Sequence, residues 1–441
     1  MRTLLRLLLV TTAIGCGGGG GDDGGPDGPP AGATLTERLT VADVAVAEGA
    51  RAGESSWRIW GTSSLEVAPV FTAPTADCGA LIGFTTGSAA PTARVVKVDA
   101  SDRLVASFEL GPYTLRGLAA EDDGHFAALL WDEAVTPAAL HVQRFDAGGA
   151  AGWSTALADT LAAPTDFGIG DSRLTYGNGR YGAYYHVHGI SGFANGHEGD
   201  QLKWLDATSG AMSNGWSWGC SHSMSALLGF QPADAKWVAM CVTDCYPGTS
   251  GDFATNSIGG LYLDNRTKVL DIDGGCNGSV AGELGSAAAA PSGWKVVWNS
   301  HQTPATGGQR SYDPQAMNQD IGFATIGGDL TPGAITWLTT TIGNEHDPSI
   351  ARWQPDGDDA EQYVVGWHEE GPDAAYRLGV VDGTGAFTAA ATDVSTVAAW
   401  GERDDPFRVH KNHDVAWAWF DAAGSTTLKV ARIRSGRACT P

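Results

Sequence analysis

The feature that most constrains the fold is a short apolar segment that returns along the chain and ends each time in aspartate or histidine. Each copy has the length of a β-strand, is rich in β-branched and aromatic residues, and is bounded by glycine, aspartate or proline. Six copies align, over residues 125–132, 180–188, 236–244, 294–301, 362–368 and 413–421. This self-similarity predicts a fold built from repeated units rather than two or three unlike domains.

Each copy lies within a larger unit of about 40 to 60 residues that contains further predicted strands. A smaller strand precedes it, at 114–119, 172–176, 223–230, 279–285, 349–353 and 406–410. A third strand follows it, at 140–146, 201–206, 260–264, 320–326, 376–382 and 428–433. A fourth, more degenerate strand closes most units, for example at 268–272 and 335–340, and one earlier unit fits residues 65–110 with strands at 65–71, 78–85, 93–99 and 104–110.

Four antiparallel strands per unit are typical of a β-propeller blade, and the chain resembles β-propellers in general. No Asp-box, Gly-His…Trp-Asp or kelch double-glycine motif recurs, so the resemblance is to the architecture and not to a named family. We predict an all-β, seven-bladed β-propeller over residues 35–441, in preference to a large sandwich or a β-helix, because sandwiches rarely repeat one four-strand unit seven times.

The last unit has only three strands, and residues 39–46 form a strand with no other place in the repeat. We therefore predict that this N-terminal strand closes the last blade, which removes an open sheet edge. Cys78 and Cys439 belong to the first and last blades, and we expect a disulfide between them. Such a disulfide closes a loop of roughly 360 residues and is expected to stabilise the fold by about 5 kcal/mol.

The first residues resemble a bacterial lipoprotein signal. Arg2 and Arg6 flank a short apolar run that leads into Gly15 and Cys16, and the run is too short for a permanent membrane span. The resemblance implies a signal peptide over residues 1–15 and a diacylated N-terminus at Cys16. The alternative is an ordinary signal peptide with an incidental cysteine.

Residues 16–34 are rich in glycine, aspartate and proline and predict a flexible tether, whose length of about 22 Å holds the body clear of the headgroups. In bacterial lipoproteins an aspartate directly after the lipidated cysteine marks inner-membrane retention, and Gly17 stands there instead. We therefore expect an exported protein anchored in the outer membrane, with the periplasmic or cell-surface leaflet left open.

The remaining cysteines also indicate an oxidising compartment. Without Cys16 the count is even, which favours disulfides. The pairing among Cys220, Cys241, Cys245 and Cys276 stays open. A zinc site at Cys241 and Cys245 is the weaker interpretation, because no second close pair of cysteines accompanies them.

Charge excludes one class of partner. The chain has 50 Asp+Glu against 27 Lys+Arg and a formal net charge of −23, so nucleic acid is not expected to bind. The membrane is expected as a partner only through the lipid anchor.

In a propeller, the loops before the first strands and between the second and third strands open on one face around the central channel. Polar side chains converge there, beside long loops at 189–200, 245–259 and 302–319. Histidines with nearby carboxylates are typical ligands of Zn, Mn or Cu, and Ca is the oxygen-ligated alternative. The candidate metal ligands are His188, His222, His301 and His368, with Asp347 orienting a ligand or acting as a base. The competing interpretation is that these strand-end groups only satisfy loop amides.

Other residues on this face are candidates for direct ligand contact: His186, Arg173, Trp216 and Asp405. Arginines recur in the first strands, at Arg116, Arg173, Arg352 and Arg408. They either line the channel and bind carboxylated sugars by bidentate pairing, or pair with aspartates between blades.

Two functions follow. The first is a lipid-anchored envelope module that binds or scaffolds a protein or a glycan at the propeller face. The alternative is a metal-dependent polysaccharide-degrading enzyme, a lyase or hydrolase, since some seven-bladed polysaccharide lyases use a histidine-rich metal site on this face. Nucleophilic catalysis has little support because no GxSxG motif is present.

Overall fold

The structure is a computed structural model of the chain. It describes residues 32–53, 66–87, 89–135, 139–157, 168–188, 199–216, 225–247, 257–263, 267–270, 281–300, 319–371, 374–400 and 406–440.

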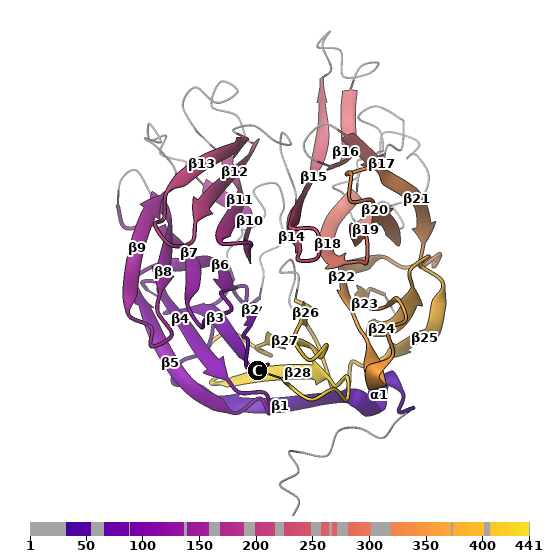
Figure 1. The fold of residues 1–441 in the computed structure, drawn as a ribbon, viewed down its shortest axis with the longest axis horizontal. Coiled ribbons are helices and arrows are strands. Elements are labelled where there is room, and N and C mark those ends of the chain that lie inside the picture. Colours follow the sequence, from indigo (N-terminus) through magenta and orange to yellow (C-terminus); the bar gives the residue numbers. More distant parts are fainter. Residues whose placement is uncertain are drawn as a thin grey trace, which may run out of the picture.

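These residues form an all-β structure of seven four-stranded antiparallel sheets arranged around a centre (Figure 1). Two sheets contain β2 (Phe71–Pro74), β3 (Ala80–Thr86), β4 (Thr92–Val98), β5 (Leu104–Gly111), and β6 (Thr114–Ala120), β7 (Phe126–Asp132), β8 (Ala139–Phe145), β9 (Ala151–Ala156). The next two contain β10 (Gly168–Gly177), β11 (Arg180–His188), β12 (Gly199–Asp206), β13 (Met212–Trp216), and β14 (Ser225–Gln231), β15 (Lys236–Pro247), β16 (Ser257–Leu263), β17 (Thr267–Leu270). Two more contain β18 (Ala281–Ala289), β19 (Trp294–Ser300), β20 (Asp320–Ile326), β21 (Pro332–Trp337), and β22 (Glu345–Arg352), β23 (Gln362–Glu369), β24 (Ala375–Asp382), β25 (Phe387–Asp393).

The remaining sheet is composite, because it joins the two ends of the described chain. Its order is β1 (Leu39–Ala45), β28 (Thr427–Ile433), β27 (Val415–Trp419) and β26 (Arg408–Val409). The antiparallel register of β1 and β28 runs from Leu39 opposite Ile433 to Ala45 opposite Thr427. The predicted pairing of the N-terminal strand with the last strand is therefore present.

The β-propeller architecture is confirmed, with a qualification on the number of blades. The sequence predicts seven, and the structure has six blades that are each built from four consecutive strands. The composite sheet differs from these six because it is assembled from distant segments and its inner strand, β26, has only two residues.

Burial explains why the second strands carry the strongest sequence signal. Every residue of β3 and β19 is buried, since both faces of these strands are covered by neighbouring sheets. The fourth strands lie at the outer edge, where β5 alternates between exposed and partly buried residues and β25 is mostly exposed. This difference accounts for the degenerate pattern of the fourth strand in each repeat.

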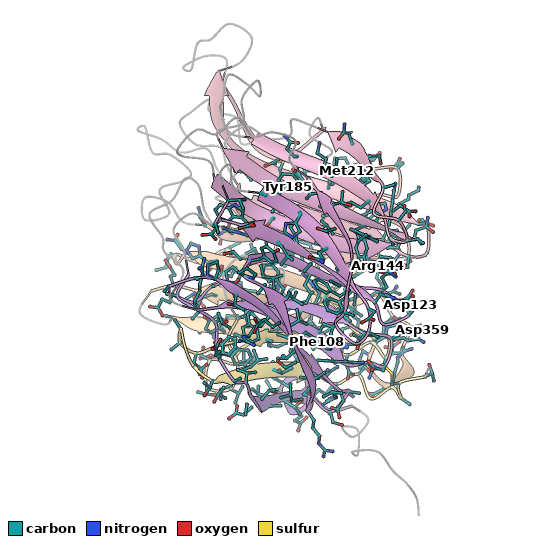
Figure 2. All side chains as sticks on the ribbon, turned by 90° about the vertical axis from the view of Figure 1, so that its left-hand side faces the viewer. Phe108, Asp123, Arg144, Tyr185, Met212 and Asp359 are labelled. Atoms are coloured by element: carbon teal, nitrogen blue, oxygen red, sulfur yellow. A yellow bond between two sulfur atoms is a disulfide. The ribbon has the colours of Figure 1, made fainter. Side chains whose placement is uncertain are left out.

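The core is divided into apolar clusters that lie between neighbouring sheets rather than in one centre. One cluster joins Met240 to Trp298 of the next sheet, and another joins Phe84 to Phe420, which directly follows β27 of the composite sheet. Figure 2 shows the side chains that fill the spaces between the stacked sheets. Each sheet is thus stabilised mainly by its two neighbours, as in other repeat architectures.

The composite sheet is joined to the first sheet by a buried ion cluster and a disulfide. Arg432 of β28 donates from Nε and Nη2 to Asp102, in the turn after β4, at 2.9 and 2.6 Å, and from Nη1 to the Cys78 carbonyl at 3.2 Å. Cys78 forms the predicted disulfide with Cys439, with Cα atoms 6.0 Å apart. Cys241 is also disulfide-bonded, and its partner lies outside the described side chains.

Two local features differ from the sequence predictions. The first strand of the first unit is predicted at 65–71, but β2 begins only at Phe71, because the Ala68 N–H instead donates to the Arg51 carbonyl at 2.9 Å. A short helix, α1 (Leu35–Arg38), precedes β1 and is not predicted. Its capping box between Thr34 and Glu37 is the sequence signal for it.

Within the described part of the chain, no helix has the length and apolar character needed to cross a membrane.

The ion cluster predicts that two aspartates that pair with β28 contribute very differently to the free energy of unfolding. Asp102→Asn removes the closer carboxylate partner of the buried Arg432 and leaves only Asp414, at 3.6 Å, so we expect a loss of about 3–5 kcal/mol in the free energy of unfolding. Asp43→Asn removes the pair with Lys429, in which the Asp43 side chain is 65% exposed, and is expected to cost about 0–1 kcal/mol. Urea unfolding measures both, and equal losses would contradict the proposed role of the cluster.

Candidate functional site

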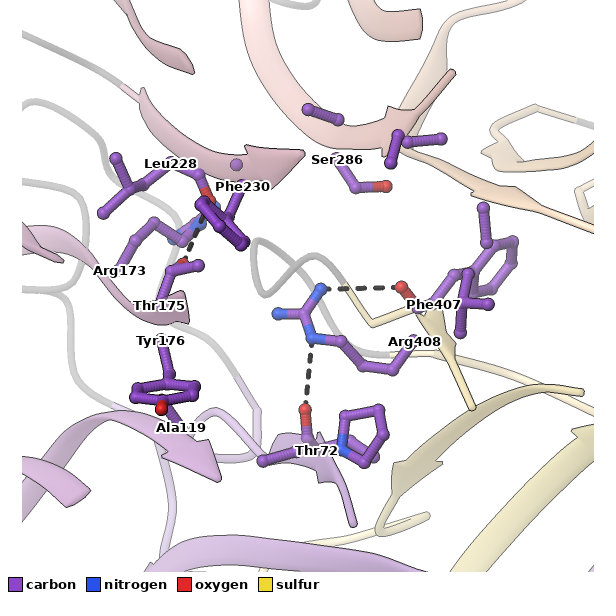
Figure 3. Close-up of a pocket in the computed structure, with 18 of the residues that line it drawn as sticks. Thr72, Ala119, Arg173, Thr175, Tyr176, Leu228, Phe230, Ser286, Phe407 and Arg408 are labelled. Atoms are coloured by element: carbon purple, nitrogen blue, oxygen red, sulfur yellow. Dashed lines mark hydrogen bonds between the residues drawn. The ribbon is translucent and has the colours of Figure 1, made fainter. Parts of the chain in front are cut away.

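The first strands of all seven sheets surround a central cavity of about 580 Å³ (Figure 3). Each strand contributes lining residues, among them Thr72, Ala119, Arg173, Phe230, Ser286, Arg352 and Arg408. The cavity is therefore the central channel that the propeller prediction places at the axis.

Small residues let the first strands approach one another closely around this channel. A Cβ atom on Gly117 of β6 would lie 2.8 Å from the Leu174 Cβ of β10, and one on Gly229 of β14 would lie 3.1 Å from the Ala287 Cβ of β18. A contact of 2.8 Å is essentially never seen for real Cβ atoms, so glycine is required at Gly117 for the observed spacing, whereas the contact at Gly229 is tight.

Three of the four recurring arginines line the channel. Arg408 projects into it, where its Nε donates to the Thr72 carbonyl at 3.1 Å and its Nη1 to the Phe407 carbonyl at 3.5 Å (Figure 3). Arg116 is instead buried over the Trp131 ring, 4.6 Å from its centroid. Burial lowers the pKa of Arg116 to about 9.

Arg173 combines both interpretations offered by the sequence. It lines the channel, and its Nη1 also donates to Asp171 Oδ1 at 2.5 Å. The second carboxylate oxygen of Asp171 accepts from the Ala226 N–H of the next sheet at 2.7 Å. The aspartate therefore links two neighbouring sheets and holds the arginine at the same time.

Arg352 and His413 line the channel toward the ends of the first strands. Arg352 is the last residue of β22, and its Nε has no hydrogen-bond partner among the described residues. His413 lies in the turn after β26 with a left-handed φ of 63°. Burial, followed by the charges of Arg437 and Arg352, lowers the pKa of the His413 imidazole, which favours its neutral form.

The opposite ends of the strands carry the polar face predicted from sequence, and buried carboxylates do gather there. We call this the start face, defined by Asp171, Asp200, Asp320 and Glu345. Asp320 accepts from the Thr341 N–H at 3.0 Å. Asp200 accepts from the Tyr184 hydroxyl at 2.7 Å and lies 2.8 Å from Nδ1 of His186. These contacts support the structural interpretation for the residues involved.

His186 in particular forms a cross-strand pair. It lies directly opposite Asp200 in the β11–β12 register, and both side chains are buried. Its predicted contact with a ligand stays a prediction, since its described partner belongs to the protein.

Of the four candidate metal ligands and Asp347, only His368 and Asp347 have described side chains. His368 stacks on Tyr376 with ring centroids 4.6 Å apart. Asp347 lies in an irregularity of β22 with φ 52°, and its carbonyl accepts from Trp400 Nε1 at 3.2 Å. In the part of the chain that the structure describes, no three His, Cys, Asp or Glu side chains gather as a metal site.

The remaining predicted site residues lie wholly or partly outside the described part of the chain. His222, His301, Asp405 and Cys16 lie outside the described residues, and so do the side chains of His188 and Trp216, although the backbones of these two belong to β11 and β13. The metal site therefore stays a prediction.

Comparison with known proteins shows no family for this chain. No family model and no curated protein matches the chain. Among solved structures, the chain is similar to the β-propeller domain of the Trilobed protease from Pyrococcus furiosus, with 9% identity, a TM-score of 0.42, and coverage of 83% of this chain and 93% of that one. The Dos1 propeller has 12% identity and a TM-score of 0.44, with coverage of 85% of this chain and 94% of that one. A Trypanosoma rangeli sialidase in complex with sialic acid has 9% identity and a TM-score of 0.39, with coverage of 77% of this chain and 58% of that one. Likeness at this level implies nothing about activity.

Glu345 generates a prediction about pH. It is fully buried, and burial, with the nearby charges of Asp320 and Glu369, raises its pKa to about 7 although Thr341 and Thr339 donate to it. The folded state therefore holds this proton more tightly than the unfolded state, and stability from this group falls as pH rises from about 4.5 to 7.

We expect Glu345→Gln to remove that loss. One pKa unit corresponds to about 1.4 kcal/mol. The free energy of unfolding of the variant minus that of wild type should therefore be larger at pH 8 than at pH 5, by on the order of 1–3 kcal/mol. Glu66→Gln, at an exposed position, is the control and should show no such gain. Urea unfolding at the two pH values is the measurement, and a parallel pH dependence in wild type and Glu345→Gln would refute the assignment.

Proposed function

We propose that this protein is a lipid-anchored binding module of the cell envelope, in which a seven-bladed propeller holds a glycan in its central channel. The observation that carries the proposal is the cavity of about 580 Å³ to which all seven first strands contribute. This volume falls within the usual range of about 300–1,000 Å³ for small-ligand sites. It suits a sugar or short oligosaccharide better than a folded protein partner.

The seventh blade in this proposal is the composite sheet. It is supported by two apolar clusters, one that joins Trp417 to Val364 of the β22–β25 sheet and one that joins Val430 to Ile82 of the β2–β5 sheet. Its inner strand also supplies Arg408 to the channel, in line with the other first strands. These contacts support counting the composite sheet as a seventh blade between the first and last continuous ones.

The lipid anchor is proposed from the sequence, and one contact supports the direction in which the tether leaves the body. The Gly32 N–H, at the start of the described chain, donates to Asp356 Oδ2 at 3.2 Å. Asp356 lies in the turn between β22 and β23, and Arg38 of α1 pairs with the same carboxylate. We call this side of the ring, defined by Cys78, Asp102, Asp356 and His413, the closure face. The described chain therefore begins at the closure face, opposite the start face, and in this proposal the tether joins the body there.

Substitution of the lipidation site tests the anchor. We expect Cys16→Ser to abolish metabolic labelling with palmitate and to move the protein from the membrane to the soluble fraction. Gly17→Asp keeps the lipid and should shift the protein from the outer to the inner membrane fraction. Continued membrane association of Cys16→Ser would contradict lipid anchoring.

Recovery of intact ligand tests binding against catalysis. The exported protein, purified in detergent and immobilised, is exposed to a panel of neutral and acidic oligosaccharides. At least one should be retained and recovered unchanged by mass spectrometry. Retention of none contradicts the glycan-binding function. Release of shortened or unsaturated products contradicts a pure binding module and favours the metal-dependent enzyme.

A further inference from the structure

The channel has a charge opposite to that of the chain. The formal net charge is −23, yet the described lining residues include Arg352, Arg408, His413 and Arg173, the last of which is paired with Asp171, and no aspartate or glutamate. A basic cavity inside an acidic protein attracts anions locally while the outer surface repels them. This contrast indicates a selective site rather than a general electrostatic attraction.

The basic groups gather on neighbouring strands. Arg352 ends β22 and Arg408 begins β26, and these strands are adjacent in the ring. His413 lies in the turn that follows β26 and is close enough to Arg352 to be affected by its charge. Three residues with nitrogen donors therefore line one region of the channel, toward the closure face.

The two guanidinium groups are placed differently. The two backbone carbonyls of Thr72 and Phe407 fix the Arg408 guanidinium across the cavity (Figure 3). Arg352 has a buried Nε that lacks a hydrogen-bond partner among the described residues, which is costly for a charged donor unless a ligand accepts from it. A planar guanidinium matches the geometry of an oxyanion.

The rest of the lining is largely apolar and includes Leu118, Leu228, Phe230 and Ile350. Apolar walls exclude water and strengthen a charge-assisted hydrogen bond. They also provide a surface for the body of a ligand whose anionic group meets the arginines.

We propose that the channel binds the oxyanion group of a small ligand, a carboxylate or a phosphate, through Arg352 with Arg408 and His413 beside it. This inference rests on the proposed binding function and specifies the chemistry of the ligand. The two oxyanions share the same recognition, so the experiment separates them.

Isothermal titration calorimetry on the exported protein in detergent is the test. The probes are D-glucuronate as the carboxylate, inorganic phosphate, and methyl glucoside as the neutral sugar. We expect saturable binding of one or both oxyanions, with the tighter one identifying the source, and no binding of methyl glucoside. Arg352→Gln should weaken that binding at least tenfold, because a hydrogen bond to a charged group is lost. Arg352→Lys keeps the charge and should lose less.

Arg103→Gln is the matched control, since it removes one positive charge at an exposed position outside the cavity and should change the affinity less than about twofold. Melting temperatures of all variants establish that they are folded. Equal affinities of Arg352→Gln and Arg103→Gln, or absence of oxyanion binding to wild type, overturn the channel site.

These outcomes are separable from failure of the broader function. Retention of a neutral oligosaccharide without oxyanion binding rejects the channel site and leaves the binding module in place. Oxyanion binding accompanied by breakdown of an acidic oligosaccharide supports the channel site and rejects a pure binding module.

Discussion

The pairing of β1 with β28 is the constraint on which the rest of the structure depends. Each sheet is held mainly by its two neighbours, so the ring of sheets is closed only if the composite sheet forms. Without β1, the sheet of β26 to β28 would expose β28 as an open edge with unpaired N–H and C=O groups. The ion cluster of Arg432 with Asp102 and the Cys78–Cys439 disulfide reinforce the same junction. Hydrogen bonds, charge and a covalent bond thus converge on the place where the chain has to meet itself.

Closure also determines what the channel can be. Glycine and alanine on the first strands allow the sheets to approach the axis, and the cavity that remains is lined by side chains from every sheet. No aspartate or glutamate is among the described lining residues, and at the start face Asp171 and Asp320 accept hydrogen bonds from backbone N–H groups. This division leaves the axis basic, and it explains how a strongly acidic chain can offer a site for an anion.

Much of the fold was predictable because burial on both faces produces uninterrupted apolar runs. The second strands, such as β19, are of this kind. The partner of β28 was predictable for a different reason, because the last unit lacks a fourth strand. The start of β2 was not predictable, because the Ala68 N–H is satisfied by Arg51, a contact between separate segments. The partners of individual polar groups are likewise a property of the packed ring. Strand position alone placed Arg173 on the channel, but not its bond to Asp171. Strand position also placed His186 on the start face, but not its contact with Asp200.

The position of both terminal segments on the closure face has a mechanical consequence. Gly32 and Arg38 hold the start of the described chain to Asp356, and β1 follows directly. With the proposed anchor in place, tension on the tether reaches the ring through this contact and the β1–β28 ladder. Beyond β28, the chain continues to Cys439, whose disulfide returns the load to Cys78 in the first sheet. The covalent bond therefore lies across the seam that a pull from the membrane would otherwise open.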